Sequence, residues 1–390
     1  MTPDVIVVGA GYAGCVTARI LADAGRKVLI LERRNHIGGN AFDYLDENGV
    51  MRHEYGPHIF HTNSKKAVDF LSRFTDWYQY EHRVLGSIEG KLVPIPFNLK
   101  SIELLFSNEK ADHLKEVLIN VYGMNTKVPI LELRKNDDPQ IQELAEYIFE
   151  HVFKYYTMKQ WGYSAEEIDP AVTARVPVLV SYDDRYFQDS YQMMPSEGFT
   201  RMFENMLDHE NITVQLGTEA MDHLKIDPEN GAVYFNDNLF ENPVIYTGLV
   251  DQLLNYVNGD LPYRSLEFDV QTKDGQFQPV TTVNYPGPAE EYPYTRITEY
   301  KNMQKEPPVE KTTIAVEYPY VYNRNGKKGN VPYYPVFTDD SKQKYSAYVK
   351  LLENVPNIYL LGRLAEYKYY NMDAIVDAAI EFSHQLLEKE

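Results

Sequence analysis

Three glycines and one acid near the start of the chain have the types and spacing of a dinucleotide-binding turn. Gly9, Gly11 and Gly14 follow a short β-branched run, and Glu32 comes about 20 residues after the first of them. In such a turn the first glycine makes the bend, the second lets the backbone approach a pyrophosphate, and the third lets helix and strand pack closely. Glu32 would accept hydrogen bonds from ribose hydroxyls. The spacing predicts a bound dinucleotide in preference to a purely structural turn.

Charge and aromatic content limit the other chemistry. The formal charge of −19 at pH 7 argues against nucleic acid or an anionic membrane surface as a partner. An anionic substrate would need a few arginines close to it, because the net negative charge of the protein repels it. The chain also has 32 tyrosines, 17 phenylalanines and 2 tryptophans. This composition suits a cleft that stacks rings and hydrogen-bonds hydroxyl groups.

Residues for nucleophilic or metal chemistry are sparse. His58 and His61 lie in a glycine-proline loop, but no third ligand spacing supports a metal, so we interpret them as polar groups beneath a ring system. The single cysteine, Cys15, excludes disulfides, and we interpret it as a small helix residue. No Ser-His-Asp or Cys-His set is found. A bound cofactor that carried the chemistry itself would need neither such a set nor a metal.

The elements that must position the glycine turn alternate between buried strands and helices. Strands are predicted at residues 4–8, 27–31, 211–217 and 357–361, and helices at 15–24 and 373–387. This order predicts an α/β protein in which the dinucleotide lies at the carboxyl ends of a parallel sheet. No stretch is long and apolar enough to span a membrane, and the N-terminus has no charged leader, so a cytoplasmic protein is expected.

Two other stretches have different patterns. Residues 99–161 are predicted to be helical, with one apolar stripe that runs to Val121 and Gly123 and a second that opens at Asp138. The aromatic-rich end of the second helix is expected to face a ligand, and the irregular run from Gly162 to Arg175 is a candidate mobile lid. Residues 280–336 predict a mostly antiparallel sheet. Residues 91–97 predict a short edge strand because they contain prolines.

Several segments carry a resemblance to known proteins. The glycine pair at 38–39, just past Glu32, resembles the FAD domain of the glutathione-reductase type, which favours FAD over NAD. Eight segments in order resemble bacterial UDP-galactopyranose mutases: 7–11, 37–40, 56–62, 159–162, 182–187, 294–296, 332–335 and 362–373. The His-Ile-Phe-His-Thr, Lys-Gln-Trp-Gly and Tyr-Tyr-Pro segments are together specific to that family. The chain departs from it at Asn371, where many members have an acid, and at His82, where others have Asn.

The resemblance implies an enzyme that interconverts UDP-galactopyranose and UDP-galactofuranose without net redox change. In that family, N5 of the reduced FAD attacks the anomeric carbon of the sugar and UDP leaves. The resemblance further implies a cytoplasmic homodimer, an external reductant such as NAD(P)H, and a product used for cell-wall polysaccharide. Two rival interpretations share the FAD domain: a flavin oxidoreductase of the amine-oxidase or desaturase kind, and a non-enzymatic FAD sensor. Neither would need the arginines and aromatic residues.

The same resemblance implies site residues. Catalytic roles are implied for Arg175, Arg296 and His61, the two arginines holding the UDP diphosphate. FAD contacts are implied for Gly9, Gly11, Tyr12, Ala13, Gly14, Glu32, Arg33, Gly39, Asn40, His58, Ile59, Thr218, Gly362, Arg363, Met372 and Asp373. Substrate contacts are implied for His82, Phe153, Tyr156, Thr157, Trp161, Arg175, Tyr186, Asn284, Arg296, Tyr334 and Tyr369.

The predicted fold class is therefore α/β, with an FAD-binding Rossmann-like parallel-sheet domain into which a helical domain and an antiparallel β-sheet domain are inserted. The FAD-binding domain is expected to comprise residues 1–82, 195–260 and 340–390. The helical domain is expected at 98–180, with the lid near 162–175. The sheet domain is expected to comprise 83–97, 181–194 and 261–339.

Overall fold

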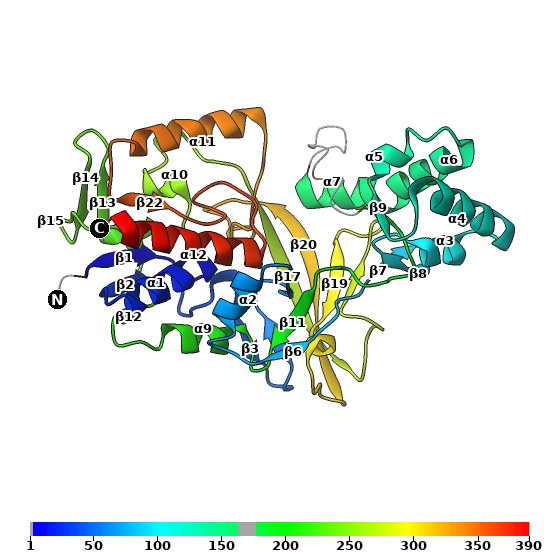
Figure 1. Cartoon of the computed structure of the whole chain (residues 1–390), viewed down its shortest axis with the longest axis horizontal. Coiled ribbons are helices and arrows are strands. Elements are labelled where there is room, and N and C mark those ends of the chain that lie inside the picture. Colours follow the sequence, from blue (N-terminus) through cyan, green and yellow to red (C-terminus); the bar gives the residue numbers. More distant parts are fainter. Residues whose placement is uncertain (1–2, 163–176, 390) are drawn as a thin grey trace.

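The computed structural model describes residues 3–162 and 177–389, and a five-stranded parallel sheet occupies one end of the molecule (Figure 1). Its strand order is β12 (Ile212–Gln215), β2 (Val28–Leu31), β1 (Val5–Val8), β16 (Val244–Tyr246) and β22 (Ile358–Leu360). Every pairing in it is parallel. The expectation that the strands near 211–217 and 357–361 rejoin the first sheet is confirmed. β16 was not predicted.

Helices cover both faces of this sheet because its strands are apolar on both sides. Val5 and Val7 of β1 belong to the core beneath α1 (Tyr12–Asp23) and α12 (Met372–Lys389), which pack against each other (Figure 1). Ile6 and Val8 belong to the opposite core, with α10 (Val250–Leu253) and α11 (Asp339–Leu352). The first helix begins at Tyr12, directly after Gly11, so it starts earlier than residue 15. Cys15 is fully buried in it and its Sγ donates to the Ala10 carbonyl, at 3.2 Å.

A seven-stranded sheet forms the middle of the molecule. Its order is β21 (Tyr334–Pro335), β17 (Tyr263–Asp274), β20 (Lys311–Val321), β19 (Arg296–Glu299), β18 (Thr282–Asn284), β7 (Val84–Ile88) and β8 (Lys91–Ile95). The mostly antiparallel sheet is confirmed, although β18 and β7 pair in parallel and β17 begins well before residue 280. β8 lies at the edge, as its prolines predicted.

The helical unit lies at the far end of the middle sheet (Figure 1). It comprises α3 (Leu99–Leu105), α4 (Asn108–Tyr122), α5 (Ile130–Leu133), α6 (Pro139–Ile148), the π-helix η2 (Phe149–Lys154) and α7 (Tyr155–Trp161), with β9 (Thr126–Val128) paired to β10 (Val178–Val180). The Asp138 side chain caps α6, and Gly123 ends α4 with φ +79°. Val121 is 56% exposed, so its expected place in the apolar stripe is wrong.

Shorter elements join these units. They are η1 (Gly39–Ala41), β3 (Asp43–Leu45), β4 (Met51–His53), β5 (Phe60–Thr62), α2 (Lys65–Leu71), β6 (Trp77–Gln79), β11 (Tyr191–Pro195), α9 (Phe199–Leu207), η3 (Ala220–Asp222), β13 (Leu224–Asp227), β14 (Ala232–Phe235), β15 (Asn238–Leu239) and η4 (Tyr300–Met303). β11 lies between β5 and β6. Residues 55–59, in the loop before β5, line a cavity that is described below.

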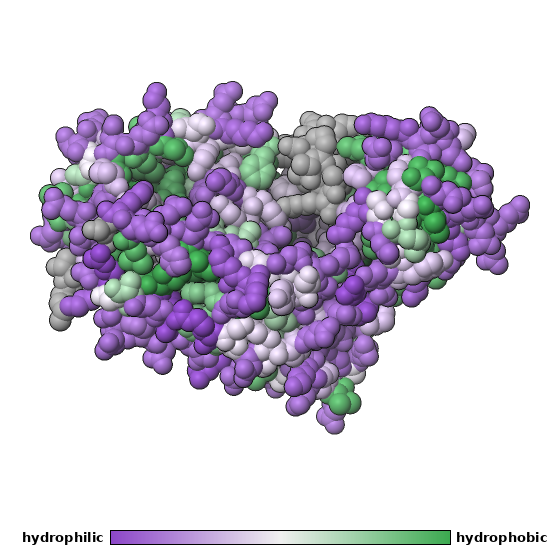
Figure 2. Space-filling view, in the orientation of Figure 1, coloured by the Kyte–Doolittle hydropathy of each residue, from purple (hydrophilic) through white to green (hydrophobic). Residues whose placement is uncertain are grey.

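Part of the expected lid lies outside the described residues. Gly162 ends α7 in the left-handed conformation, while residues 163–176, including Arg175, are not described. Among the described residues, no helix is both long and apolar enough to cross a membrane. Hydrophilic side chains cover most of the face shown in Figure 2, in keeping with the charge of −19. The predicted domain boundaries stay a prediction.

Candidate functional site

The predicted glycines form the turn between β1 and α1. Gly9 has φ +101°, which favours glycine. A Cβ on Gly14 would lie 2.0 Å from the carbonyl oxygen of Gly9, so this glycine allows helix and strand to pack closely. A Cβ on Gly11 would meet only Gly39 Cα, at 3.7 Å. The backbone of Gly11 is therefore left open to a ligand.

Glu32 is fixed at the end of β2. Its side chain is buried, Oε2 accepts from the Ala10 amide and Oε1 accepts from the Arg34 amide, both at 2.8 Å. Each oxygen keeps further acceptor capacity for a hydroxyl group. Glu32 and the last residues of β1, β2 and β16 line a cavity of about 250 Å³, together with the glycine turn. The cavity thus lies at the carboxyl ends of the parallel strands.

Most residues predicted to hold the cofactor line this first cavity. They are Gly9, Gly11, Tyr12, Ala13, Glu32, Arg33, Gly39, Asn40, His58, Gly362, Arg363 and Met372. Gly14 lies beneath the turn, and Ile59 lines a second cavity. Thr218 and Asp373 line neither: the Thr218 amide donates to the Glu32 carbonyl, and Asp373 accepts from the Thr62 hydroxyl, at 2.7 Å. The bare Gly11 backbone, the Glu32 carboxylate and the cavity between them fit a flavin dinucleotide.

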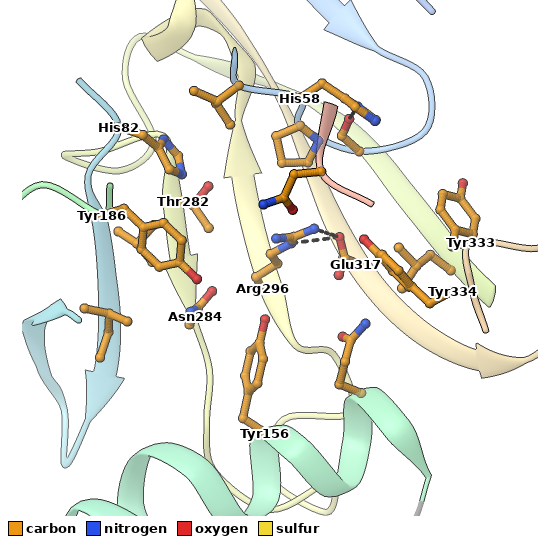
Figure 3. A pocket seen from close by; sticks show the side chains of 18 of the residues that line it. His58, His82, Tyr156, Tyr186, Thr282, Asn284, Arg296, Glu317, Tyr333 and Tyr334 are labelled. Carbon is orange, nitrogen blue, oxygen red and sulfur yellow. Dashed lines mark hydrogen bonds and ion pairs between the residues drawn. The ribbon is translucent and has the colours of Figure 1, made fainter. Parts of the chain in front are cut away.

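The second cavity, of about 460 Å³, continues from the first. The two cavities share Asn40, His58, Tyr333, Arg363, Asn371 and Met372. All the described residues predicted to contact substrate line the second cavity: His82, Phe153, Tyr156, Thr157, Trp161, Tyr186, Asn284, Arg296, Tyr334 and Tyr369. His61 lines it as well. The structure therefore brings together residues from α7, the middle sheet, the 53–62 loop and the segment before α12 (Figure 3).

An ion pair lies at the centre of this second cavity (Figure 3). Arg296 on β19 donates from Nε and a terminal nitrogen to Glu317 Oε2, at 2.8 and 2.7 Å. Burial alone would lower the pKa of Arg296, but Glu317 and neighbouring tyrosines outweigh it and raise the pKa. The Glu317 side chain is only 2% exposed, whereas that of Arg296 is 25% exposed. Arg296 is thus a fixed cation with part of its surface open to a ligand.

Aromatic side chains surround the ion pair. Tyr334 stacks on Tyr369 with ring centroids 6.0 Å apart, and Trp161 lies 6.4 Å from Tyr334. The Arg363 guanidinium lies over both tyrosines, at 5.1 and 5.2 Å from their ring centroids. Burial raises the pKa of Tyr156 and of Tyr334, so both hydroxyls stay protonated at physiological pH. The cavity therefore offers flat surfaces and neutral hydroxyl donors.

The histidines of the cavity are held by different partners. His58 Nδ1 lies 2.8 Å from the Gly56 carbonyl, which can only accept, so Nδ1 carries the proton. His82 Nδ1 lies 3.2 Å from the Tyr80 hydroxyl. Burial is the main cause that lowers the pKa of His58 and of His82 to about 3, so both are neutral. His61 instead contacts a carboxylate, that of Asp189. No group of three or more potential metal-ligating side chains occurs among the described residues, 3–162 and 177–389.

Two charged residues, Glu317 in the second cavity and Lys159 outside it, were given no role from the sequence. Glu317 carried a signal, because an acid within the apolar strand 312–318 is buried only with a partner. Lys159 lies in the family-specific Lys-Gln-Trp-Gly segment. Its Nζ donates to the carbonyls of Tyr285, Tyr292 and Tyr294, at 2.7, 2.9 and 3.0 Å. Lys159 thereby ties α7 to the loop before Arg296, a contact that the sequence gives no means to foresee.

Comparison with known proteins agrees with this geometry. A family model described as UDP-galactopyranose mutase matches residues 151–369, and one described as an NAD(P)-binding Rossmann-like domain matches residues 7–74. A UDP-galactopyranose mutase of Mycoplasma genitalium is 35% identical over 98% of this chain and 95% of its own length. A dTDP-fucopyranose mutase of Escherichia coli is 32% identical over 97% and 96%. The crystal structure of a reduced UDP-galactopyranose mutase superimposes with a TM-score of 0.72 at 17% identity, over 100% of this chain and 95% of that one.

The Rossmann-like sheet, its glycine turn and the adjoining cavity define an FAD-binding α/β protein. The second cavity, with its fixed arginine and aromatic walls, fits a nucleotide sugar. The chain belongs to the UDP-galactopyranose mutase family.

Proposed function

We propose that this protein interconverts UDP-galactopyranose and UDP-galactofuranose, with reduced FAD as cofactor and no net redox change. The observation that carries the proposal is the continuity of the two cavities. The dinucleotide cavity continues into the second cavity. There the buried carboxylate of Glu317 fixes Arg296, and part of the Arg296 guanidinium stays open to a ligand. When bound, the reduced flavin supplies the nucleophilic centre of the reaction. The side chains of the protein bind, orient and shield the nucleotide sugar.

The proposed roles follow from the contacts of each group. Arg296 holds the diphosphate, because a guanidinium pairs two phosphate oxygens without losing its proton. Arg175, which lies outside the described residues, is proposed to assist it. Trp161 walls in the nucleotide sugar. Hydrogen bonds to the diphosphate and the sugar come from Tyr156, Tyr186, Tyr334, Tyr369 and Asn284, while Phe153, Thr157 and His82 complete the wall.

The cofactor residues are assigned in the same way. Gly9, Gly11 and the start of α1 are proposed to receive the pyrophosphate, and Glu32 the ribose. His58 lies where the two cavities meet. Its protonated Nδ1 donates to the Gly56 carbonyl, so Nε2 of the neutral ring offers a hydrogen-bond acceptor there. Ile59, Arg363 and Met372 border the flavin. Thr218 and Asp373 act from outside the cavities.

Other features of the proposal rest on membership of the family. We propose a homodimer that works in the cytoplasm, takes electrons for its flavin from NAD(P)H, and provides a precursor of cell-wall polysaccharide. A flavin oxidoreductase is the weaker alternative. The second cavity presents an arginine, a carboxylate and tyrosines where an oxidase acting on apolar substrates would need an apolar channel.

The test is turnover of UDP-galactofuranose by the purified flavin-loaded protein, followed by separation of the two ring forms. Turnover is expected only after the flavin is reduced with dithionite, and the flavin should remain reduced throughout. Oxidation of the sugar in step with flavin reduction would support the oxidoreductase instead. Because one relative is named a dTDP-fucopyranose mutase, dTDP-fucopyranose is assayed in parallel. A higher kcat/KM for dTDP-fucopyranose would replace the proposed substrate.

A further inference from the structure

We propose that Asp189 is a positioning residue that fixes the tautomer of His61, and that His61 then carries a proton between two oxygens of the sugar as its ring form changes. This inference rests on the proposed function, since it supplies a proton carrier for that reaction. The two residues are 128 positions apart in the sequence, and nothing in the sequence pairs them.

His61 is held from three directions. Its backbone lies on β5, opposite Gln192 of β11. Its ring stacks on Phe187, with ring centroids 3.5 Å apart and an interplanar angle of 11°. Its Nδ1 lies 2.9 Å from Asp189 Oδ2. Together these contacts fix both the position and the rotation of the imidazole.

Asp189 is itself held in place. Its Oδ1 accepts from the side-chain amide of Asn63, at 2.9 Å, and Asn63 Oδ1 accepts from the Ser190 backbone amide, also at 2.9 Å. Asn63 lies two residues after His61, and Ser190 follows Asp189, so the two segments exchange hydrogen bonds on both sides of the His61–Asp189 contact. The carboxylate is thereby aimed at Nδ1.

The carboxylate decides where the imidazole proton lies. An ionised carboxylate can only accept, so Nδ1 must carry the proton and Nε2 of the neutral ring keeps a lone pair. Nε2 has no hydrogen-bond partner among the described residues, and the ring lines the second cavity. His58 and His82 line the same cavity, but their Nδ1 atoms contact a carbonyl and a hydroxyl. Of the histidines described there, His61 is the one oriented by a carboxylate.

The proposed reaction moves a proton from one sugar oxygen to another. A pyranose closes through O5 and a furanose through O4, so the C1–O5 bond breaks, a C1–O4 bond forms, O4 loses a proton and O5 gains one. His61 Nε2 can accept the proton of O4 and donate it to O5 as the C1–O5 bond breaks, with Asp189 stabilising the imidazolium in between; the deprotonated O4 then bonds to C1. The proton count balances within one residue, and no external acid or base is consumed. The reverse reaction uses the same steps in the opposite order.

The test uses flavin-loaded protein with ¹⁵N-labelled histidine, in which the tautomer is read from the ¹⁵N chemical shifts. The His61 signals are assigned by their loss in His61→Gln. The wild type is expected to show the Nδ1–H tautomer. Asp189→Asn should populate the Nε2–H tautomer and lower kcat by roughly 100-fold or more, with flavin content and KM within about twofold of wild type. Asp189→Glu keeps a carboxylate and should restore the Nδ1–H tautomer and part of the turnover.

Asp69→Asn is the matched control, because Asp69 is an exposed carboxylate that pairs with Lys65 at the surface. It should change neither the tautomer nor kcat. An Nε2–H tautomer in the wild type would overturn the positioning role of Asp189. Full turnover in Asp189→Asn, or a loss confined to flavin content and KM, would overturn the proton transfer. The tautomer is measured without turnover, so an inactive wild type would refute the proposed function separately.

Discussion

Arg296 and Glu317 lie directly opposite each other on the antiparallel strands β19 and β20, and both Arg296 donors reach the same oxygen of Glu317. The strand register thus sets the position of the guanidinium in the cavity. A second contact joins Thr295 to the same carboxylate, since its hydroxyl lies 3.3 Å from Glu317 Oε1. Both oxygens of Glu317 are therefore engaged, one by Arg296 at the start of β19 and the other by Thr295 just before it.

Glu317→Gln should weaken both folding and catalysis. The change leaves Arg296 without its counter-charge, and because the guanidinium is partly exposed we expect a loss of about 2 kcal/mol in unfolding free energy, below the range for a fully buried pair. We expect kcat/KM to fall by about tenfold or more as the guanidinium loses its fixed position. Denaturant unfolding and steady-state kinetics measure the two effects. Glu204→Gln, which breaks the exposed pair with Arg201, should leave both values near wild type.

Arg296→Ala should remove the principal cation for the diphosphate. Loss of a charged hydrogen-bonding partner in a desolvated site should lower kcat/KM by an amount equivalent to about 2 to 5 kcal/mol. Both kcat and KM should change, because UDP is also the leaving group. Arg296→Lys should rescue only in part, since a point charge replaces a planar fork. Arg201→Ala is the control at an exposed site. The sequence predicts the same loss for Arg175→Ala.

Trp161→Ala should weaken binding of the nucleotide sugar without unfolding the protein. Trp161 is half-buried in the wall of the second cavity, and loss of a ring that stacks on a nucleotide should cost about 1 to 3 kcal/mol of binding. The Tm should change little. The other tryptophan, Trp77, stacks on Phe60 and donates to Ser72. Trp77→Phe should leave the KM unchanged and make Trp161 a fluorescent reporter of UDP binding. A lower Tm with an unchanged KM for Trp161→Ala would assign Trp161 to the core.

Gly11→Ala should weaken FAD binding without lowering the stability of the folded protein. The added Cβ meets nothing closer than 3.7 Å in the protein, so the folded chain should accept it. A pyrophosphate bound close to the Gly11 backbone would clash with the same Cβ. We expect the apo-protein to keep its Tm while FAD affinity falls by tenfold or more, measured by flavin fluorescence. Gly25→Ala is the contrast: its Cβ enters open space at φ +87°, so it should lower stability by about 1 kcal/mol and leave FAD affinity intact. Normal FAD binding by Gly11→Ala would place the pyrophosphate elsewhere.

The protein should lose stability as the pH falls from about 6.5 toward 3. Burial lowers the pKa of His53, His58 and His82 to about 3, whereas an unfolded histidine has a pKa near 6.5. Between these values the unfolded chain binds protons that the folded chain does not. The unfolding free energy should therefore fall by about 1.4 kcal/mol per pH unit for each histidine. In His82→Asn, the unfolding free energy should fall less steeply with pH over this range, by about 1.4 kcal/mol per pH unit, as measured by urea unfolding. A curve parallel to that of the wild type would contradict the neutral state of His82.

The fold was largely predictable because its signals are local. The turn at Gly9 and Gly11, the acid at Glu32 and the apolar strands depend on neighbouring residues, and the structure confirms the parallel sheet. β16 (Val244–Tyr246) was missed because it has only three residues and is followed by a helix of only four, whereas β22, which is equally short, is followed by the long amphipathic helix α12. Val121 fits the helical period, but in the last turn of α4 it is Tyr122 that packs against the core, while Val121 is exposed.

The site was predictable only in part. The described residues predicted to contact substrate lie together in one cavity, and five of them, Trp161, Tyr186, Arg296, Tyr334 and Tyr369, belong to the segments that resemble the family. The pairs Arg296–Glu317 and His61–Asp189 were not foreseen, since each depends on which strands or loops become neighbours. Thr218, which donates to the Glu32 carbonyl, and Asp373, in the first turn of α12, line no part of either cavity described.

The burial of Cys15 has a practical consequence for labelling the protein. It is the single cysteine of the chain, its thiol is fully buried within α1, and burial raises its pKa, so the reactive thiolate is suppressed. A cysteine introduced at an exposed position would therefore be the one thiol open to maleimide reagents. Pairs of such cysteines, one on the helical unit and one on α11, would accept fluorescent dyes without removal of any native residue. Distance changes between the two ends of the molecule could then be followed by energy transfer as nucleotide sugar is added.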